Sequence, residues 1–370
     1  MTNFSAHDHA HMARALQLAE RAAYTTQPNP MVGCVIADRE RVLGEGWHVR
    51  AGEPHAEVNA LRAAGGLAQG ATAYVTLEPC AHHGRTPPCA DALVAAGVTR
   101  VVAASRDPYY QVAGQGFAKL EAAGVTVEHG LMEAQARHLN RGFFSRIERG
   151  RPWVRVKLGM SLDGRTALAN GDSKWITSEA SREDVQRWRA RSGAIMTGIG
   201  TVLADNPRLT VRLPEGVDFV PPLRVVVDER GRLPADCLLL TDGTASTLAV
   251  HGDDVVPAYG DEVSAFAVRR FVHGGLDLGA VLSQLAQRGV NELQVEAGAT
   301  LSGALLRNGL VDELLLYVAP VLLGEKAKPL FAGVDPTSMA TRLGLKLIDT
   351  RQVGPDLRLT LVPDAGTLGR

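Results

Sequence analysis

His55-Ala56-Glu57, followed by Pro79-Cys80 and later by Cys89, is the part of the sequence around which the chain is organised. One histidine and two cysteines can hold a zinc ion and leave its fourth position open to water. The glutamate two residues after the histidine can move protons for that water. We therefore expect His55, Cys80 and Cys89 to bind zinc and Glu57 to be the acid–base catalyst.

The spacing of the two cysteines is unusual. The signature H-x-E…P-C-x-x-C is typical of zinc-dependent base deaminases, but here eight residues separate Cys80 from Cys89. His82 and Arg85 in this longer loop are candidate contacts for a polar or anionic substrate group, and an exposed Gly/Pro loop is the alternative. A structural zinc completed by His82 or His83 is a further alternative, but it gives Glu57 no role.

The composition excludes several classes of protein. A chain of 370 residues predicts two or three domains. The formal net charge of -1 does not favour a nucleic-acid surface, and no apolar run approaches the ~18 residues that a membrane helix needs. We see no secretory signal, so we expect a cytoplasmic protein in which cysteines bind metal rather than form disulfides.

The N-terminal half reads as a three-layer α/β domain. The turn Pro28-Asn29-Pro30 ends the first helix, and Asn29 is either a plain turn residue or a substrate contact. The expected strands cover residues 32–37, 41–47, 72–77, 100–104 and 125–128, and the expected later helices cover 55–64, 89–96, 116–123 and 132–140.

The C-terminal half begins after the boundary Arg149-Gly150-Arg151-Pro152 and is again α/β. Its expected strands cover residues 153–158, 194–197, 223–228, 238–240, 247–250, 265–268, 292–296, 314–320 and 357–361, with helices at 179–191 and 278–288. A small-residue turn at Gly298 opens a further helix, which is typical of phosphate binding, although ordinary tight turns have the same composition. No G-x-G-x-x-G pattern is present, so a standard Rossmann domain is not expected.

With Lys157-Leu158-Gly159-Met160-Ser161-Leu162-Asp163-Gly164-Arg165, these motifs resemble the bifunctional deaminase/reductase family of riboflavin biosynthesis over almost the whole chain. The resemblance implies a cytidine-deaminase-like domain over residues 1–149 and a dihydrofolate-reductase-like α/β domain over residues 150–370. It also implies deamination of 2,5-diamino-6-(5-phosphoribosylamino)pyrimidin-4-one. NADPH would then reduce the ribosyl group of the product, 5-amino-6-(5-phosphoribosylamino)uracil, to ribityl.

The resemblance also assigns roles to residues of the C-terminal half. It places NADPH near Gly159, Trp175, Thr201, Asp205 and the turn Gly298, Ala299, Thr300 and Leu301. It places the substrate near Ser173, Arg189, Leu209, Arg212 and Glu296. The two arginines suit a ribose phosphate, and solvated surface charges are the alternative. Lys157 is expected to assist protonation of the ring-opened sugar, with a paired structural lysine as the alternative.

Two other functions are alternatives to the bifunctional enzyme. The first is a single-activity nucleobase or nucleoside deaminase whose C-terminal half serves binding or oligomerisation. The second is a zinc-stabilised nucleic-acid binder, which the near-neutral charge disfavours. For any of the three, a chain of this size is expected to form a homo-oligomer, a dimer or tetramer.

Overall fold

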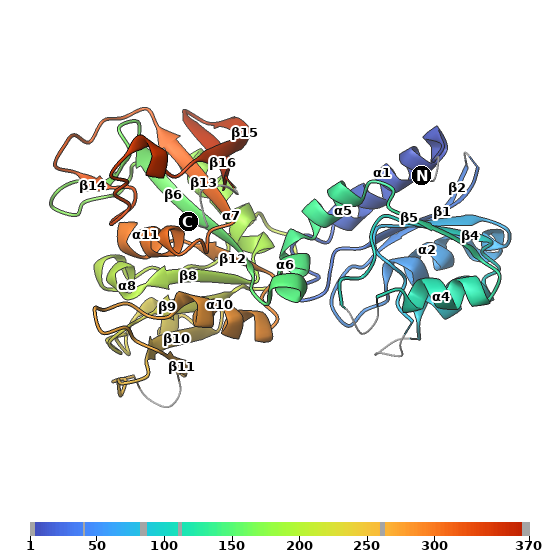
Figure 1. Cartoon of the computed structure of the whole chain (residues 1–370), viewed down its shortest axis with the longest axis horizontal. Helices are drawn as coiled ribbons and strands as arrows, with labels where there is room; N and C mark the ends of the chain where they lie inside the picture. Colours follow the sequence, from blue (N-terminus) through green and yellow to red (C-terminus); the bar gives the residue numbers. More distant parts are fainter. Residues whose placement is uncertain (1–3, 40, 82–86, 110–112, 260–262, 365–370) are drawn as a thin grey trace. The chain divides into compact units, whose positions relative to one another are not determined.

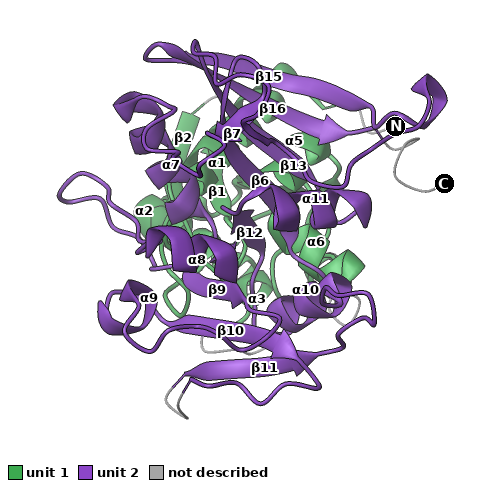
Figure 2. Cartoon of the chain, turned by 90° about the vertical axis from the view of Figure 1, so that its left-hand side faces the viewer, with its two compact units in different colours: residues 1–150 green, residues 151–370 purple. Residues whose placement is uncertain are grey.

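Short apolar strands alternate with helices along the chain, and the computed structural model assembles them into two units, Met1–Gly150 and Arg151–Arg370 (Figures 1 and 2). The structure describes residues 4–39, 41–81, 87–109, 113–259 and 263–364. In the described part of the chain, no helix is both long and apolar enough to span a membrane.

The N-terminal unit contains a five-stranded sheet in the order β2-β1-β3-β4-β5. Strand β1 runs antiparallel to both of its neighbours, β2 and β3, whereas β3, β4 and β5 run parallel. The strands are β1 (Gly33–Asp38), β2 (Arg41–Trp47), β3 (Thr72–Val75), β4 (Arg100–Ala103) and β5 (Thr126–His129). The helices are α1 (Ala6–Glu20), α2 (Ala56–Ala64), the 3-10 helix η1 (Gly65–Ala68), α3 (Cys89–Ala95), α4 (Gln115–Ala122), α5 (Glu133–Leu139) and α6 (Arg141–Arg149).

Both faces of this sheet are covered by helices, which gives the three layers predicted from the sequence. On one face, Ala60 of α2, Leu93 of α3 and Leu120 of α4 belong to one buried cluster with the strands. On the other face, Leu18 of α1 and Ala136 of α5 belong to a second cluster. Because successive strand residues point to opposite faces, β1, β3 and β4 each contribute to both clusters.

Glycines in β2 let α2 approach the sheet closely. A Cβ atom at Gly44 would lie 2.3 Å from the backbone oxygen of Ala60, and one at Gly46 would lie 2.3 Å from its nitrogen. No larger residue fits at either position without moving the helix. This contact fixes the start of α2, where His55 is the N-cap residue and Glu57 lies in the first turn.

The C-terminal unit is built on a nine-stranded sheet in the order β11-β10-β9-β8-β12-β6-β13-β16-β15. The seven strands from β11 to β13 run parallel to one another. Strand β16 runs antiparallel to β13, and β15 runs antiparallel to β16. Its strands are β6 (Trp153–Ser161), β7 (Arg165–Ala167), β8 (Ala194–Gly198), β9 (Leu223–Val227), β10 (Thr247–Gly252), β11 (Ser264–Val268), β12 (Glu292–Val295), β13 (Glu313–Ala319), β14 (Lys328–Pro329), β15 (Leu345–Val353) and β16 (Asp356–Pro363). Its helices are α7 (Glu179–Arg191), α8 (Ile199–Asp205), α9 (Leu238–Thr241), α10 (Leu278–Gln287), α11 (Ala299–Arg307) and the 3-10 helix η2 (Met339–Thr341).

Strand β6 lies near the centre of this sheet and has two different faces. Val154, Val156 and Leu158 join the main apolar core with α10 and α11. The other face carries Arg155, which is fully buried and bonds Glu313 at 2.6 Å and Glu292 at 2.8 Å. The same face carries Lys157 two residues further on. The central strand therefore places charged side chains inside the unit.

The structure corrects three details of the sequence prediction. Residues 238–240, expected to be a strand, form helix α9. Helix α6, after the short α5, and strand β15 were not predicted. Leu238–Leu240 is an apolar run too short for its periodicity to separate a strand from a helix turn. In β15 most residues are exposed on both faces, so the alternating pattern of a half-buried strand is absent.

Candidate functional site

Three side chains from separate elements meet in the N-terminal unit. His55 caps α2, Cys80 follows β3, and Cys89 is the first residue of α3. The Nδ1 atom of His55 lies 3.7 Å from Sγ of Cys80 and 3.3 Å from Sγ of Cys89, and the three ligand atoms lie within 4.8 Å of one another. The edges of a tetrahedral zinc site with these ligands are roughly 3.5–3.8 Å. Two sulfurs and one imidazole nitrogen therefore fit zinc in both chemistry and spacing.

The two thiols of this cluster share one proton. The hydrogen bond with Cys89 lowers the pKa of Cys80 to about 4, and the backbone N–H of Cys89 also donates to the Cys80 sulfur at 3.3 Å. The same pairing, together with burial, raises the pKa of Cys89. The hydrogen bond with Cys80 raises the pKa of His55 above 6.5. A cation would replace the shared proton, because zinc binds thiolates.

Glu57 lies beside this cluster and is buried, with 3% of its surface exposed. Burial, and next the negative charge on Cys80, raise the pKa of Glu57 to about 7. A carboxyl group that titrates near neutral pH can both accept and release a proton, which is what a general acid–base catalyst requires. The local geometry thus unites a three-ligand metal site with a proton carrier.

Of the candidate deaminase residues outside the cluster, only Asn29 is among the residues that the structure describes. The Asn29 amide bonds the ring of His48 at 3.0 Å, and the rings of His48 and His55 are 5.2 Å apart. Asn29 is therefore connected to the metal cluster through His48, a residue that the sequence analysis missed. His82, His83 and Arg85 lie outside the described residues.

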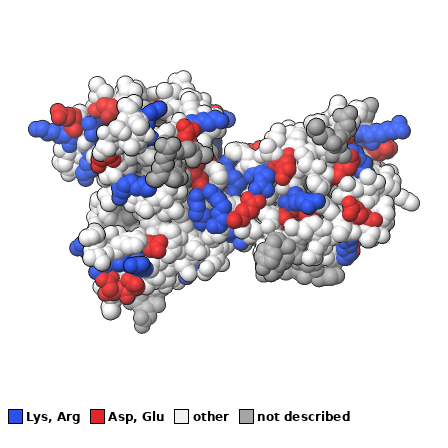
Figure 3. Space-filling view, viewed as in Figure 1, with Lys and Arg blue, Asp and Glu red and all other residues white. Residues whose placement is uncertain are grey.

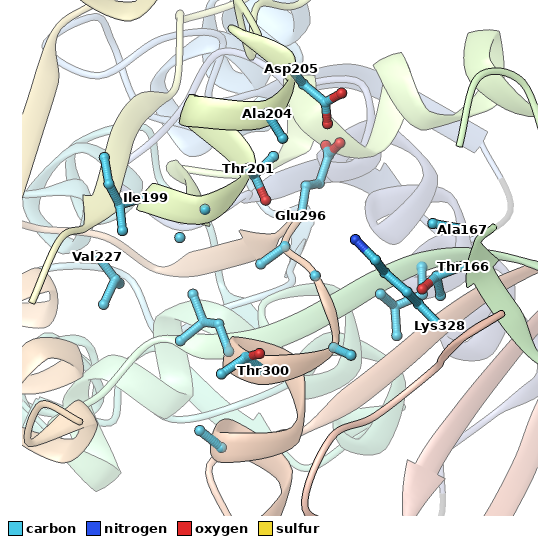
Figure 4. A pocket seen from close by; sticks show the side chains of 18 of the residues that line it. Thr166, Ala167, Ile199, Thr201, Ala204, Asp205, Val227, Glu296, Thr300 and Lys328 are labelled. Carbon is cyan, nitrogen blue, oxygen red and sulfur yellow. The ribbon is translucent and has the colours of Figure 1, made fainter. Parts of the chain in front are cut away.

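A large pocket opens in the C-terminal unit, with a volume of about 1010 Å³ (Figure 4). It lies where β8, β9 and β12 end, which is where open α/β sheets bind ligands. The expected residues that line it are Lys157, Gly159, Ser173, Trp175, Thr201, Asp205, Glu296, Gly298, Ala299, Thr300 and Leu301. In the close view, Asp205 and Thr201 of α8, Glu296 after β12 and Lys328 of β14 converge on one space.

The pocket has features that suit a dinucleotide. Gly298 is the N-cap residue of helix α11 and provides no side-chain cap. A Cβ atom at Gly298 would meet nothing within 4 Å, so the backbone there is open to a ligand. Free amides at a helix start attract phosphate, and the volume accommodates a long cofactor. The residues present therefore fit NADPH.

Two of the pocket residues, Lys157 and Glu296, form a charged group with Arg189. Arg189 donates two hydrogen bonds of 2.7 Å to Glu296, and Gln294 donates a third at 2.8 Å. Burial alone would raise the pKa of Glu296, but Arg189 and then Lys157 bring it down to about 2. Burial lowers the pKa of Lys157, and nearby Arg189 adds to that effect. Glu296 is therefore a fixed anion, and Lys157 is a cation that loses its proton more easily than usual.

Three expected substrate residues do not line the pocket. The Arg189 guanidinium is engaged by Glu296 and by the carbonyl of Thr210, at 2.8 Å. Leu209 is buried in an apolar cluster. Arg212 is exposed, and its backbone nitrogen donates to Gln186.

Several cations of the pocket were missed from the sequence. Arg182, Arg230, Arg232 and Lys328 line it. Arg230 and Arg232 follow β9, and a basic residue after a strand of an α/β sheet was the signal that could have identified them. Elsewhere the charges are mixed, and Figure 3 shows Lys and Arg beside Asp and Glu on the visible face of each unit.

Two family models match the chain. "Cytidine and deoxycytidylate deaminase zinc-binding region" covers residues 5–105, which include the His/Cys cluster, and "RibD C-terminal domain" covers residues 152–359. The riboflavin biosynthesis protein RibD of Escherichia coli strain K12 is 49% identical over 96% of this chain and 99% of that protein. The protein of the same name from Haemophilus influenzae is 44% identical over 98% of this chain and 99% of its own.

Solved structures of similar proteins match this chain over nearly its whole length. Acinetobacter baumannii RibD is 47% identical, with a TM-score of 0.89 and coverage of 97% of this chain and 99% of that one. A diaminohydroxyphosphoribosylaminopyrimidine deaminase/5-amino-6-(5-phosphoribosylamino)uracil reductase from Thermotoga maritima is 30% identical. Its TM-score is 0.86, and the match covers 96% of this chain and 99% of that one.

Proposed function

The chain belongs to the bifunctional RibD deaminase/reductase family of riboflavin biosynthesis, and from this we propose a substrate and a set of catalytic residues for each activity. Residues 1–149 deaminate 2,5-diamino-6-(5-phosphoribosylamino)pyrimidin-4-one with zinc. Residues 150–370 reduce the ribosyl group of 5-amino-6-(5-phosphoribosylamino)uracil to ribityl with NADPH. The observation that supports this most strongly is that each unit holds its own site: the His/Cys cluster with Glu57 in one, and the cofactor-sized pocket with Lys157 in the other.

In the deaminase unit, His55, Cys80 and Cys89 would hold zinc, which when bound acidifies the attacking water. The Glu57 carboxylate would carry two protons in turn, one from the water to the pyrimidine nitrogen and a second from the added hydroxyl group to the amine, which leaves as ammonia. In the metal-free site, burial raises the pKa of Glu57 to about 7, which suits a group that both accepts and releases a proton. His82 and Arg85 are retained as proposed substrate contacts.

In the reductase unit, the turn from Gly298 to Leu301, with Gly159, Trp175, Thr201 and Asp205, would hold NADPH, which supplies the hydride when bound. Lys157 gives a proton from Nζ to the ring-opened sugar as it is reduced. Glu296, held by Arg189, keeps an anion beside that lysine. Ser173 lines the same pocket, and Arg189, Leu209 and Arg212 remain proposed substrate contacts outside that lining.

A single assay tests both activities. The zinc-loaded chain is incubated with the diaminopyrimidine ribosyl phosphate, with and without NADPH, and the products are followed by mass spectrometry. We expect the deaminated product in both reactions and the reduced product only with NADPH. Deamination without any consumption of NADPH would restrict the chain to a single-activity deaminase.

Zinc affinity should depend on pH. In the metal-free site Cys80 is a thiolate above about pH 4 and Cys89 keeps its proton, so zinc displaces about one proton from the two cysteines. We expect affinity to rise about tenfold per pH unit above the pKa of His55, and more steeply below it, where His55 also releases a proton. Competition with a chromophoric chelator from pH 6 to 8 measures this, and Cys34→Ala, at a buried cysteine outside the cluster, should keep the same slope. A flat profile would contradict the ligand assignment.

Arg230 and Arg232 are proposed to bind the 2′-phosphate of NADPH. An acidic residue after a strand commonly bonds the ribose of NADH, whereas arginine accepts the extra phosphate. Asp228, after β9, is fully buried and accepts from the backbone of Leu233 at 2.7 Å, so it faces the protein.

Replacing both arginines by alanine should therefore weaken NADPH binding about 10- to 100-fold and leave NADH binding unchanged. Equilibrium titration of cofactor fluorescence measures both constants. Arg288→Ala, at the C-cap of α10 and outside the pocket, is the control. An equal loss for NADPH and NADH would count against the assignment.

A homo-oligomer, a dimer or tetramer, is proposed on the basis of β15. Leu347 and Ile348 are 54% and 49% exposed on this edge strand, and an apolar edge readily pairs with a second copy. Light scattering should show a mass of at least two chains for the wild type and a lower mass for Ile348→Lys. Leu67→Lys, at an exposed leucine of the N-terminal unit, should not change it. An unchanged mass for Ile348→Lys would place the contact elsewhere.

The cytoplasm is the proposed location, because the two cluster cysteines must stay reduced to bind metal. Cell fractionation with an antibody to the chain tests this.

A further inference from the structure

His48 is a buried histidine, 2% exposed, that follows β2 and lies against the zinc-ligand candidate His55. Its two ring nitrogens have different partners. Nδ1 lies 3.2 Å from the carbonyl oxygen of Pro54, and Nε2 lies 3.0 Å from the side-chain nitrogen of Asn29. A carbonyl oxygen only accepts hydrogen bonds, so Nδ1 must carry a proton.

This constraint sets the state of the other nitrogen. The atom that faces Nε2 is the Asn29 amide nitrogen, which donates hydrogen bonds, so the ring is neutral and only Nδ1 carries a proton. With the proton on Nδ1, Nε2 is a bare acceptor. The Asn29 amide must then present its NH₂ group to His48, since its oxygen would face a lone pair in the other orientation.

The orientation of Asn29 follows from this chain of bonds. Its Oδ1 points away from His48, and no residue in the part of the chain that the structure describes donates to it. The side chain is only half-buried, so a ligand can reach it. The pyrimidine carbon that reacts must lie next to His55, whose ring contacts that of His48. Asn29 lies one imidazole ring away from that position, which makes a group of the pyrimidine its expected partner.

We propose that His48 is a positioning residue of the deaminase, which holds the Asn29 amide so that Oδ1 accepts a hydrogen bond from an N–H of the aminopyrimidine substrate. The proposal rests on the deaminase function proposed above. It makes Asn29 a specificity residue: a pyrimidine with an acceptor at this position would face the Asn29 oxygen and bind poorly.

A double-mutant cycle with His48→Phe and Asn29→Ala tests the coupling. Each single variant should raise the deaminase KM about 3- to 10-fold, with a much smaller change in kcat. The double variant should resemble Asn29→Ala alone, because His48 acts through Asn29. His48→Gln, whose amide oxygen can accept from Asn29, should recover most of the wild-type KM.

Controls separate this effect from general damage. His11→Phe replaces another buried histidine of the same unit, one that bonds the backbone of Arg39, and should leave KM unchanged. Zinc content and the reductase activity of the same chain should be unchanged in every variant. If His48→Phe binds too little zinc to assay, His48→Gln and Asn29→Ala decide.

Effects that multiply in the double variant, or an unchanged KM in Asn29→Ala, would overturn the proposal while the deaminase function stands. A zinc-loaded wild type without deaminase activity would instead refute the proposed function, and this inference with it.

Discussion

Glu57→Gln is expected to lower deaminase turnover by about 10²- to 10⁴-fold, the usual contribution of a general acid–base group. Glutamine fills nearly the same space, but its amide cannot take a proton from water and return it to the pyrimidine. Zinc content should remain, because the proposed ligands are His55, Cys80 and Cys89. The defect should therefore be in kcat, and should persist at saturating substrate.

The second activity of the chain provides the control for this variant. NADPH-dependent reduction of supplied 5-amino-6-(5-phosphoribosylamino)uracil should proceed at the wild-type rate. Glu53→Gln, at an exposed glutamate just before α2, should leave both activities intact. Deaminase turnover within a few-fold of wild type in Glu57→Gln would exclude Glu57 as the proton carrier.

The metal cluster was predictable because its candidate ligands lie in short sequence motifs. His55 and Glu57 are two residues apart at one helix start, and Cys89 opens the next long helix after Cys80. Local signals such as Gly65 after α2 place these helix ends without tertiary information. The glycines of β2 then allow α2 to pack closely against the sheet, which places His55 near the two cysteines.

The reductase site was less predictable because its contacts are distant in sequence. Arg189 and Glu296 are 107 residues apart, and no local pattern shows that they bond each other. The resemblance to the family assigned Arg189 to the substrate, and its bonds to Glu296 became visible only in the structure. The contact between Asn29 and His48 was also not predictable from local sequence. The two residues are 19 positions apart, and only the fold brings the Asn29 amide to the His48 ring.

Lys157→Met is expected to lower reductase turnover by about 10²- to 10⁴-fold while deamination continues at the wild-type rate. Within the described residues no carboxylate lies at ion-pair distance from Lys157, and its Nζ lies 5.8 Å from the centre of the Tyr317 ring. Its ammonium group is thus not committed to a structural ion pair, and it lines the pocket. Methionine keeps the length of the side chain and removes the proton.

The pH profile distinguishes proton donation from a purely structural role of Lys157. Burial lowers the pKa of Lys157 below its usual 10.5, and the donor must be protonated. Reductase turnover should therefore fall as the pH rises through that lowered pKa, and this limb should be missing in the residual activity of Lys157→Met. NADPH affinity, measured by fluorescence titration, should be unchanged. Lys326→Met, at an exposed lysine outside the pocket, should behave as wild type. If Lys157→Met weakens NADPH binding and keeps the alkaline limb, the lysine holds the cofactor and the proton comes from another group.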